Sequence, residues 1–178
     1  MKKAVFFDRD GTLIVDKIYL NDPAQIEYLP YVVEALTDLR DAGYVFFVAT
    51  NQSGVPRGLV QIENLHKIHA SIASYLADHK LEILEYYYAP YMTDSDHYYR
   101  KPKAGMLMEG VNNYDIDAKN SWMIGDKMTD VEAGHQAGMR SILMGGTDKP
   151  EDFDYAPPEA FLQNLQEVSD FILKNKNA

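Results

Sequence analysis

The fold is decided at residues 4–12, which read AVFFDRDGT. An unbroken apolar run is typical of a strand buried on both faces, and the acidic residues and glycine after it end the strand in a turn. The same order returns at residues 44–54, where YVFFVA leads into TNQSG, and at residues 122–126, where WMI leads into GD. Each run is therefore predicted to be a buried strand that carries polar residues to one edge of a sheet.

Segments with helical spacing separate these strands. Apolar side chains recur on one face of residues 30–43 and 62–79, and the short connections between elements favour a parallel sheet with helices on both faces. We therefore expect an α/β fold of the doubly wound, Rossmann-like class. The other elements that we expect are strands at residues 81–89 and 141–144 and helices at residues 128–137 and 159–176.

A chain of 178 residues fits one domain of this class, and we expect residues 1–178 to form a single domain. A loop and one helix use up residues 13–43, and one helix, one strand and loops use up residues 53–99. Neither connection has room for a large cap domain, so we expect an open site shaped by loops.

The composition argues against several classes of protein. The chain has 17 Lys and Arg against 27 Asp and Glu, a net charge of −10, which is the wrong sign for a protein that neutralises nucleic-acid phosphates. It has no cysteine, so it has no thiolate zinc site, and a reducing cytoplasm is its expected location. The apolar run at residues 4–7 is too short for a signal peptide or a membrane span. We expect no nucleic-acid or membrane partner, and a monomer or a small homo-oligomer.

Three acidic residues follow the predicted strands. Asp8 and Asp10 come after the first strand and Asp126 after a later one, and parallel strands bring their carboxyl ends to one edge. An isolated pair of alternating acids is more often a solvated turn, but three carboxylates at one edge repel one another unless a cation lies among them. Oxygen ligands without sulfur suit Mg²⁺, and Lys101 and Thr50 are placed to hold phosphoryl oxygens. The sequence therefore favours phosphoryl transfer, in which cations offset the repulsion between Asp8 and a phosphate.

Four motifs occupy these strand ends in order. They read FFDRDGT at residues 6–12, TNQ at 50–52, RKP at 100–102 and GDKMTD at 125–130. In this order they resemble the motifs of the haloacid dehalogenase phosphohydrolase superfamily. Within it the chain is similar, over residues 5–150, to the group of D-glycero-D-manno-heptose 1,7-bisphosphate 7-phosphatases, and less closely to histidinol-phosphate phosphatases.

The resemblance implies roles for the residues of these motifs. Asp8 is the expected nucleophile, which forms an aspartyl-phosphate, and Asp10 is expected to protonate the leaving alcohol and later to activate water. The carboxylates of Asp8 and Asp126 and the backbone carbonyl of Asp10 are the expected Mg²⁺ ligands. Thr50 and Lys101 are expected to hold the phosphoryl oxygens.

Residues around this centre are expected to order it and to bind substrate. Asp130, four residues after Asp126, is expected to orient Lys101 or a metal-bound water rather than to bind the metal. Arg100 is the first choice for a second phosphate because a guanidinium suits bidentate phosphate recognition, whereas Arg57 is equally compatible with a solvated loop charge. The expected substrate contacts are Asp16, Lys17, Ile18, Tyr19, Asn51, Gln52, Ser53, Arg57, Arg100 and Lys127.

The chain departs from the resemblance in the loop before Arg100. The similar phosphatases usually carry a zinc loop with a C-x-H and a C-x-C pair there, but this chain has APY at residues 89–91 and HYY at residues 97–99. Without thiolates we predict no zinc, and we expect the tyrosines of this region to pack together in its place. His66 and His69, on the predicted helix at residues 62–79, are expected at surface or boundary positions.

Together these residues predict a Mg²⁺-dependent phosphatase for a small sugar bisphosphate, foremost heptose 1,7-bisphosphate at its 7-phosphate, in the route to a bacterial surface glycan. Histidinol phosphate or another small phosphomonoester is the alternative substrate. A phosphomutase is less favoured, since that chemistry usually needs a closing cap. The alternative of another class is a catalytically silent binding or regulatory module of the same fold, which measurable turnover would exclude.

Overall fold

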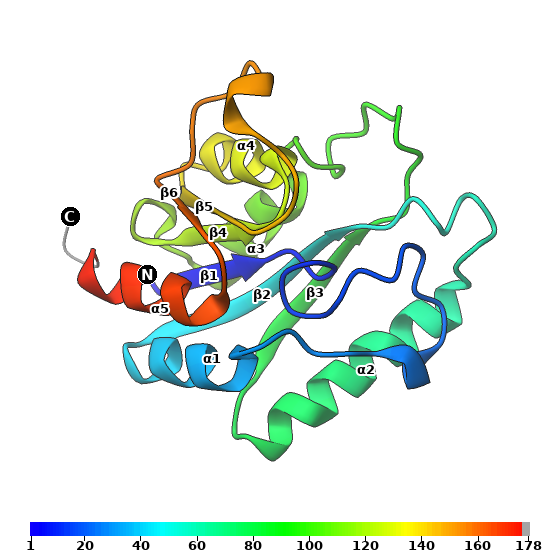
Figure 1. Ribbon diagram of the computed structural model, residues 1–178, viewed down its shortest axis with the longest axis horizontal. Coiled ribbons are helices and arrows are strands. Elements are labelled where there is room, and N and C mark those ends of the chain that lie inside the picture. The colour runs from blue at the N-terminus through cyan, green and yellow to red at the C-terminus, as the bar shows by residue number, and fades with distance from the viewer. Residues whose placement is uncertain (176–178) are drawn as a thin grey trace.

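Six parallel strands form the centre of the structure, a computed structural model that describes residues 1–175. Their order is β3-β2-β1-β4-β5-β6, so β1 lies between β2 and β4 (Figure 1). The predicted α/β class with a doubly wound parallel sheet is confirmed. The strands are β1 (Lys3–Phe7), β2 (Tyr44–Asn51), β3 (Ile83–Ala89), β4 (Trp122–Gly125), β5 (Arg140–Met144) and β6 (Ala160–Leu162).

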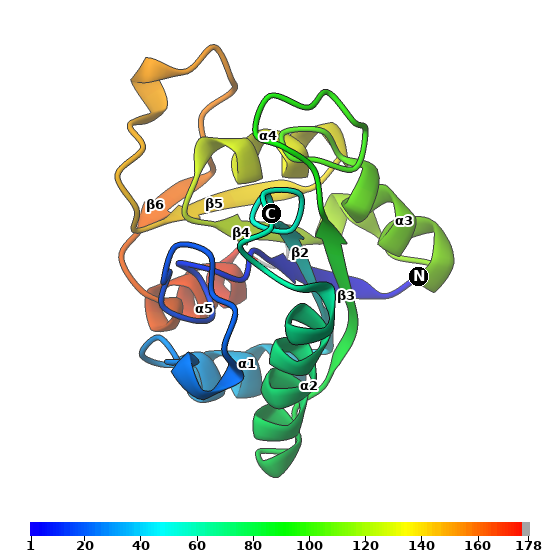
Figure 2. The same ribbon diagram turned by 90° about the vertical axis from the view of Figure 1, so that its right-hand side faces the viewer.

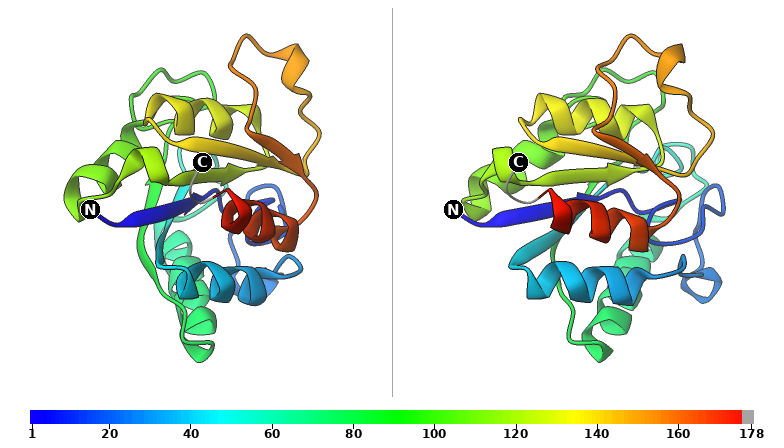
Figure 3. Two further views of the ribbon diagram at one scale, coloured as in Figure 1. Left: turned by 90° about the vertical axis from the view of Figure 1, so that its left-hand side faces the viewer. Right: turned by 60° about the vertical axis from the view of Figure 1, so that its left-hand side comes forward.

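Helices cover both faces of this sheet. Three of them, α1, α2 and α5, lie on one face, and α3 and α4 lie on the other (Figure 1, Figure 3). Among residues 1–175, no helix combines the length and the apolar character that crossing a lipid bilayer requires. The helices are α1 (Val32–Asp41), α2 (Ile62–Asp78), α3 (Gly105–Tyr114), α4 (Met128–Gln136) and α5 (Leu165–Lys174), with short 3₁₀ turns at Pro23–Gln25, Ala118–Asn120 and Pro150–Asp152.

The position of β1 explains why its sequence is apolar without a break. Val5 and Phe7 pack in the core shared with α1, α2 and α5, whereas Ala4 and Phe6 pack in the core shared with α3. All four side chains are fully buried, and burying one Val or Phe side chain contributes about 1.5–3 kcal/mol. Since both faces of the sheet are covered by helices, none of these four side chains faces water, and polar residues do not alternate with apolar ones along the strand. The buried strand holds the next residue, Asp8, in a fixed place.

The carboxyl ends of the strands form the edge at which a ligand is expected. The chain runs from β1 outward to β2 and β3 and then returns to β4 on the other side of β1, so the strand order reverses there. In Figure 2 this edge faces the viewer, with the loops after β1, β2 and β3 drawn in blue, cyan and green. Ligand clefts of open parallel sheets form at such a reversal. The fold therefore gathers loops from distant parts of the sequence at one place.

The C-terminal segment differs from the helix predicted over residues 159–176. Its first part instead forms β6, the edge strand beside β5, and α5 begins only at Leu165. The side chain of Asn164 caps α5, because it accepts a hydrogen bond from a backbone N–H of the first turn at 3.0 Å. Phe161, four residues before Leu165, fits helical spacing, but its side chain is half exposed on the edge strand. The end of the predicted helix lies outside the described residues.

Glu159 ties β6 to the rest of the sheet. Its backbone N–H donates to the carbonyl of Ser141 at 2.9 Å, and its carboxylate accepts from the Ser141 N–H at 2.6 Å. The same carboxylate lies 3.0 Å from Nε2 of His135 on α4. This hydrogen bond raises the pKa of His135 against the opposing effect of burial. A charged contact thus links α4, β5 and the start of β6.

The substitution His135→Gln is expected to destabilise the protein in a pH-dependent way. A pKa raised in the folded state gives stability that is fully present below the ordinary histidine value of about 6.5 and is lost as the pH rises through the folded value. We expect a melting temperature lower by about 2 °C at pH 6 and by much less at pH 9. Circular-dichroism melts measure the difference, with His66→Gln on the exposed side of α2 as the control. An equal difference at both pH values contradicts this role.

Candidate active site

Three carboxylates meet at the carboxyl edge of the sheet. Asp8 follows β1, Asp126 follows β4, and Asp130 lies in the first turn of α4. One oxygen of each lies within 4.8 Å of the others, and none of the three residues is more than 9% exposed. The cause is the pairing of β1 with β4, in which Phe7 lies opposite Ile124, so the residues that follow the two strands converge.

Two glycines permit this close approach. A Cβ atom at Gly11 would lie 2.3 Å from Oδ2 of Asp126, and one at Gly125 would lie 2.1 Å from Oδ2 of Asp130. Gly11 also has a φ of +83°, which L side chains rarely adopt. The turn after β1 and the end of β4 therefore need glycine so that the carboxylates can reach the centre of the site.

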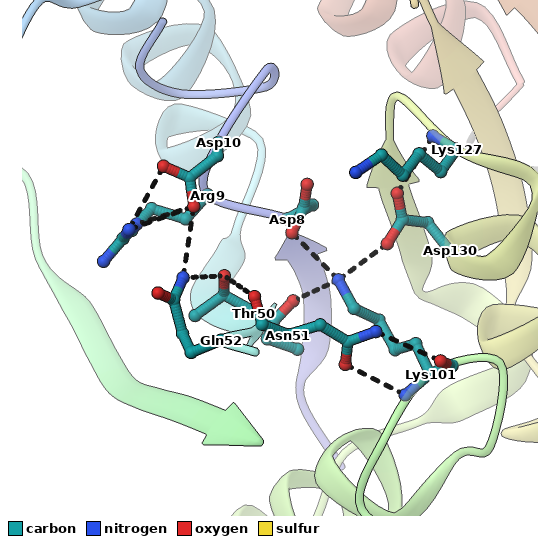
Figure 4. Close-up of polar contacts among 10 residues, drawn as sticks. Asp8, Arg9, Asp10, Thr50, Asn51, Gln52, Lys101, Lys127 and Asp130 are labelled. Carbon is teal, nitrogen blue, oxygen red and sulfur yellow. Dashed lines mark hydrogen bonds and ion pairs between the residues drawn. The ribbon is translucent and has the colours of Figure 1, made fainter. Parts of the chain in front are cut away.

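Lys101 places a buried ammonium group among these carboxylates (Figure 4). Its Nζ donates to Oδ1 of Asp8 at 2.9 Å and to the backbone carbonyl of Ala49 at 2.6 Å, and it lies 2.6 Å from Oδ1 of Asp130. Burial would lower the pKa of Lys101, but the charges of Asp130 and Asp8 outweigh burial and raise it. The lysine is therefore charged at any physiological pH and neutralises part of the acidic cluster.

Lys101, even with the more exposed Lys127 ammonium acting on the same cluster, does not balance three carboxylates. Burial, followed by the charges of Asp8 and Asp130, raises the pKa of Asp126. Burial also raises the pKa of Asp130, against the charge of Lys101. Oδ1 of Asp126 is buried and has no hydrogen-bond partner within residues 1–175. A hard divalent cation bound by carboxylate oxygens fits this surplus of negative charge and this unpartnered atom.

Asn51, predicted to contact substrate, holds the loop that delivers Lys101. Its side-chain amide donates to the Lys101 carbonyl at 3.1 Å and accepts from the Lys101 backbone N–H at 3.1 Å. Figure 4 shows this two-bond contact between the end of β2 and the lysine. Asn51 also lines the cleft. Because it binds the Lys101 backbone, it can influence a ligand indirectly, by fixing the position of the ammonium group.

Asp10 lies beside the cluster with its own set of partners. Arg9 donates to both of its carboxylate oxygens at 3.1 Å, and Nε2 of Gln52 donates to its Oδ2 at 3.1 Å. Gln52 also donates to Oγ1 of Thr50 at 2.8 Å. Burial raises the pKa of Asp10 against the charge of Arg9. A carboxyl group with a raised pKa holds a proton more readily, as an acid catalyst requires.

A cleft of about 400 Å³ opens above these groups. Two of the predicted residues, Thr50 and Asp126, lie below its surface and are not part of its lining. Lys17, whose Nζ donates to Glu27 at 2.6 Å, and Arg57 also lie outside the lining. The predicted residues that line the cleft are Asp8, Asp10, Asp16, Ile18, Tyr19, Asn51, Gln52, Ser53, Arg100, Lys101, Lys127 and Asp130.

Two arginines and a threonine, Arg57, Arg100 and Thr93, form what we term the cationic corner. Nη2 of Arg57 donates to Oγ1 of Thr93 at 3.1 Å, and both Thr93 and Arg100 line the cleft. Burial, followed by the positive charge of Arg57, lowers the pKa of Arg100. The carboxylate of Asp94 opposes this effect and balances part of the repulsion between the two guanidinium groups. An anionic group of a bound molecule would balance it further, so the corner suits such a group.

Stacked rings order the loop that leads to Arg100. Tyr91 stacks on His97 with ring centroids 3.9 Å apart, and Tyr98 and Tyr99 pack edge to face at 5.5 Å. The backbone N–H of Arg100 donates to the His97 carbonyl at 2.9 Å. The predicted packing of the loop tyrosines is therefore present, with His97 as its centre.

Several residues of the site were not predicted from the sequence. Arg9 lines the cleft, and its place in the sequence between Asp8 and Asp10 could have indicated that it belongs to the site. His69 is only 6% exposed and contacts Arg9, so the expected surface or boundary position is wrong. Thr93 lies in the loop before Arg100, one of the loops expected to shape the site, but nothing local marks Thr93 itself. The other lining residues to which the sequence analysis assigned no role are Leu20, Gly54 and Thr129, of which the last two lie within the stretches quoted at the strand ends.

The substitution Lys101→Met is expected to destabilise the protein, because it leaves three buried carboxylates without their cation. Removing one partner of a buried ion pair costs about 3–5 kcal/mol. We expect a loss of this size in the free energy of unfolding at pH 8 with a chelator present. The loss should be smaller at pH 5, where carboxyl groups with raised pKa values bind protons.

Urea unfolding at the two pH values measures this loss, with Lys103→Met, an exposed lysine of the same loop, as the control. The electrostatic account of the cluster is wrong if Lys101→Met costs the same at both pH values.

The sequence is similar to those of curated phosphatases. A family model described as HAD-hydrolase-like matches residues 98–168. The chain is 36% identical over 156 residues to the D-glycero-β-D-manno-heptose-1,7-bisphosphate 7-phosphatase of Pasteurella multocida, and the match covers 84% of this chain and 85% of the relative. It is 31% identical over 169 residues to the D-glycero-α-D-manno-heptose-1,7-bisphosphate 7-phosphatase of Campylobacter jejuni, with 95% of each chain covered.

Solved structures share the fold. D,D-heptose 1,7-bisphosphate phosphatase from B. bronchiseptica, complexed with magnesium and phosphate, matches with a TM-score of 0.87 at 28% identity and covers 97% of this chain and 99% of its own. The corresponding enzyme from Burkholderia thailandensis matches with a TM-score of 0.68 at 25% identity, over 99% of this chain and 100% of its own. The predicted superfamily is confirmed. This chain belongs to the haloacid dehalogenase (HAD) family and is a phosphoric monoester hydrolase.

Proposed function

We propose that this enzyme is a Mg²⁺-dependent phosphatase that hydrolyses D-glycero-D-manno-heptose 1,7-bisphosphate at its 7-phosphate. The observation that carries the proposal is the Lys101 ammonium between Asp8 and Asp130, beneath a cleft that Arg100 and Thr93 of the cationic corner also line. Such a cleft offers one set of groups to a phosphate that reacts and another to a phosphate that is only bound. The names of the curated relatives support the choice of sugar.

The carboxylates of Asp8 and Asp126 and the backbone carbonyl of Asp10 would hold Mg²⁺. When bound, the ion supplies positive charge that offsets the carboxylates and polarises the phosphoryl group. The close spacing of the carboxylate oxygens and the unpartnered Oδ1 of Asp126 support this fit, as does the magnesium in the B. bronchiseptica structure. Asp130, already bonded to Lys101, orients the lysine instead.

In the first step, an oxygen of Asp8 attacks the phosphorus, and the bond from phosphorus to the sugar oxygen breaks with its electron pair on that oxygen. The carboxyl group of Asp10 gives this oxygen a proton, so the sugar leaves as an alcohol. Lys101 at the cleft surface and Thr50 just below it hold the phosphoryl oxygens, and the ammonium 2.9 Å from Asp8 offsets the repulsion between carboxylate and phosphate. The enzyme is left as an aspartyl-phosphate.

In the second step, water attacks the phosphorus of the aspartyl-phosphate. Asp10, now ionised, takes a proton from this water, and the bond between phosphorus and the Asp8 oxygen breaks to release inorganic phosphate. Both carboxyl groups return to their starting forms. A residue that serves as acid and then as base needs its protonated and ionised forms to be close in free energy. For Asp10, burial favours the protonated form and the charge of Arg9 favours the ionised form.

Arg100 binds the phosphate that does not react, with Arg57 and Thr93 beside it. Asn51 keeps Lys101 in place, and Lys17, paired with Glu27, acts from outside the cleft. The residues that we assign to the sugar and its hydroxyl groups are Asp16, Ile18, Tyr19, Gln52, Ser53 and Lys127.

A panel of phosphate esters tests the substrate. With Mg²⁺ present, we expect kcat/KM for the heptose bisphosphate to exceed that for histidinol phosphate by at least about 100-fold, since the latter leaves the cationic corner empty. Asp8→Asn, which keeps the shape of the nucleophile, is expected to reduce turnover below a few per cent. A preference for histidinol phosphate would assign the alternative substrate, and a wild type that turns over no ester would leave only a binding module.

The substitution Arg100→Ala is expected to separate the two phosphates. Hydrogen bonds to charged groups contribute about 1.5–3 kcal/mol, so kcat/KM for the bisphosphate should fall by about 10- to 100-fold. p-Nitrophenyl phosphate has no second phosphate and should lose far less. Steady-state kinetics on both esters measure the ratio, with Lys103→Ala as the control. Equal losses on the two esters would remove Arg100 from substrate recognition.

A further inference from the structure

Arg9, the residue between the two acids of the first motif, is a buried cation. Only 1% of its surface is exposed, and its guanidinium faces Asp10 as a fork. Nε donates to Oδ2 of Asp10 and Nη2 to Oδ1, both at 3.1 Å (Figure 4). A planar guanidinium that binds both oxygens of a carboxylate fixes the plane of that carboxylate as well as its distance. The orientation of Asp10 therefore follows the orientation of Arg9.

His69 on α2 is the third anchor of this guanidinium. Its Nε2 lies 3.2 Å from Nη1 of Arg9, and the residue is 6% exposed. Burial and the charge of Arg9 lower the pKa of His69 to about 3, so the ring is neutral. Because arginine has only donors, Nε2 must accept this bond and the ring proton must lie on Nδ1.

The ring of His69 is itself held by packing. It stacks on Tyr86 of β3 with ring centroids 4.9 Å apart and an angle of 23° between the planes. Its neighbours in sequence and on the next turn, Ile68 and Ile72, are fully buried in the core beneath the sheet. A rigid acceptor therefore stands opposite Nη1 and stops the guanidinium from turning together with Asp10.

We propose that His69 is a positioning residue, which acts through Arg9 to hold the Asp10 carboxyl group in line with the leaving-group oxygen. The inference rests on the proposed role of Asp10 as the acid, but not on the identity of the sugar. Proton transfer needs a donor placed within hydrogen-bond reach of its acceptor, and a small misplacement lowers the rate. An Asp10 side chain held at one end only by Gln52 would be free to turn about its own bonds.

The identity of the leaving group separates positioning from a general structural role. p-Nitrophenolate spreads its charge over the ring and leaves without a proton, whereas phenolate leaves less readily and gains more from the acid. Phenyl phosphate and p-nitrophenyl phosphate otherwise place the same atoms near the metal, Asp8 and Lys101. A misplaced Asp10 should therefore slow the hydrolysis of phenyl phosphate selectively, while a damaged site should slow the hydrolysis of both esters.

The experiment compares His69→Leu, which removes the acceptor, with His69→Gln, whose amide oxygen can accept the same bond. General acid catalysis contributes about 10²–10⁴-fold, so we expect His69→Leu to lower kcat/KM for phenyl phosphate on the order of tenfold more than for p-nitrophenyl phosphate. His69→Gln should bring the ratio of kcat/KM for phenyl phosphate to kcat/KM for p-nitrophenyl phosphate most of the way back to the wild-type value. His66→Leu, on the exposed side of the same helix, is the matched control and should leave the ratio at the wild-type value.

Arg9→Lys provides the same test if His69→Leu does not fold, because it keeps the cation and removes the fork. If these variants lose the same factor of kcat/KM on the two esters, or lose nothing on either, the inference is overturned while the phosphatase assignment stands. If the wild type hydrolyses neither these two esters nor the bisphosphate in Mg²⁺, the proposed chemistry fails and this inference fails with it.

Discussion

Three carboxylates and one ammonium group share a buried site at the edge of the sheet, and the rest of the structure depends on that electrostatic constraint. Lys101 binds Asp8 at 2.9 Å and Asp130 at 2.6 Å. Because the residues of the cluster are buried, water screens their charges only weakly. The surplus of negative charge is what a divalent cation balances. Parallel strands that end together, and glycine at positions 11 and 125, allow these charges to come so close.

The loop after β3 connects this centre to the rest of the cleft. Arg100 and Lys101 are consecutive, so the loop that brings the ammonium to the carboxylates also brings a guanidinium to the cationic corner. Stacking of Tyr91 on His97 and the two hydrogen bonds between the Asn51 side chain and the Lys101 backbone fix the loop at both ends. Any shift of the loop moves both groups that we assign to phosphate, so under the proposed function it would disturb the binding of both phosphates together.

Much of the fold could be predicted from the sequence because it depends on local patterns. Unbroken apolar runs identify buried parallel strands. Asp8 follows one such run directly and Asp126 follows another after a single glycine, so their convergence follows from the fold class. The strand β6 could not be predicted, since Phe161 continues the helical spacing of α5 and only its pairing with β5 makes it a strand. The burial of His69 depends on Arg9, 60 residues away, and the contact of Asn51 with the Lys101 backbone depends on a loop 50 residues away. No periodicity within a segment reports on such long-range contacts.

The most direct test of this account is the position of a bound divalent ion. Mn²⁺ takes the same oxygen ligands as Mg²⁺ and scatters X-rays anomalously, so crystals grown with Mn²⁺ locate the site without reference to activity. The account predicts one anomalous peak between the carboxylates of Asp8 and Asp126, about 2.0–2.3 Å from an oxygen of each. Density free of any peak at that place, at a Mn²⁺ concentration that supports turnover in solution, would contradict it.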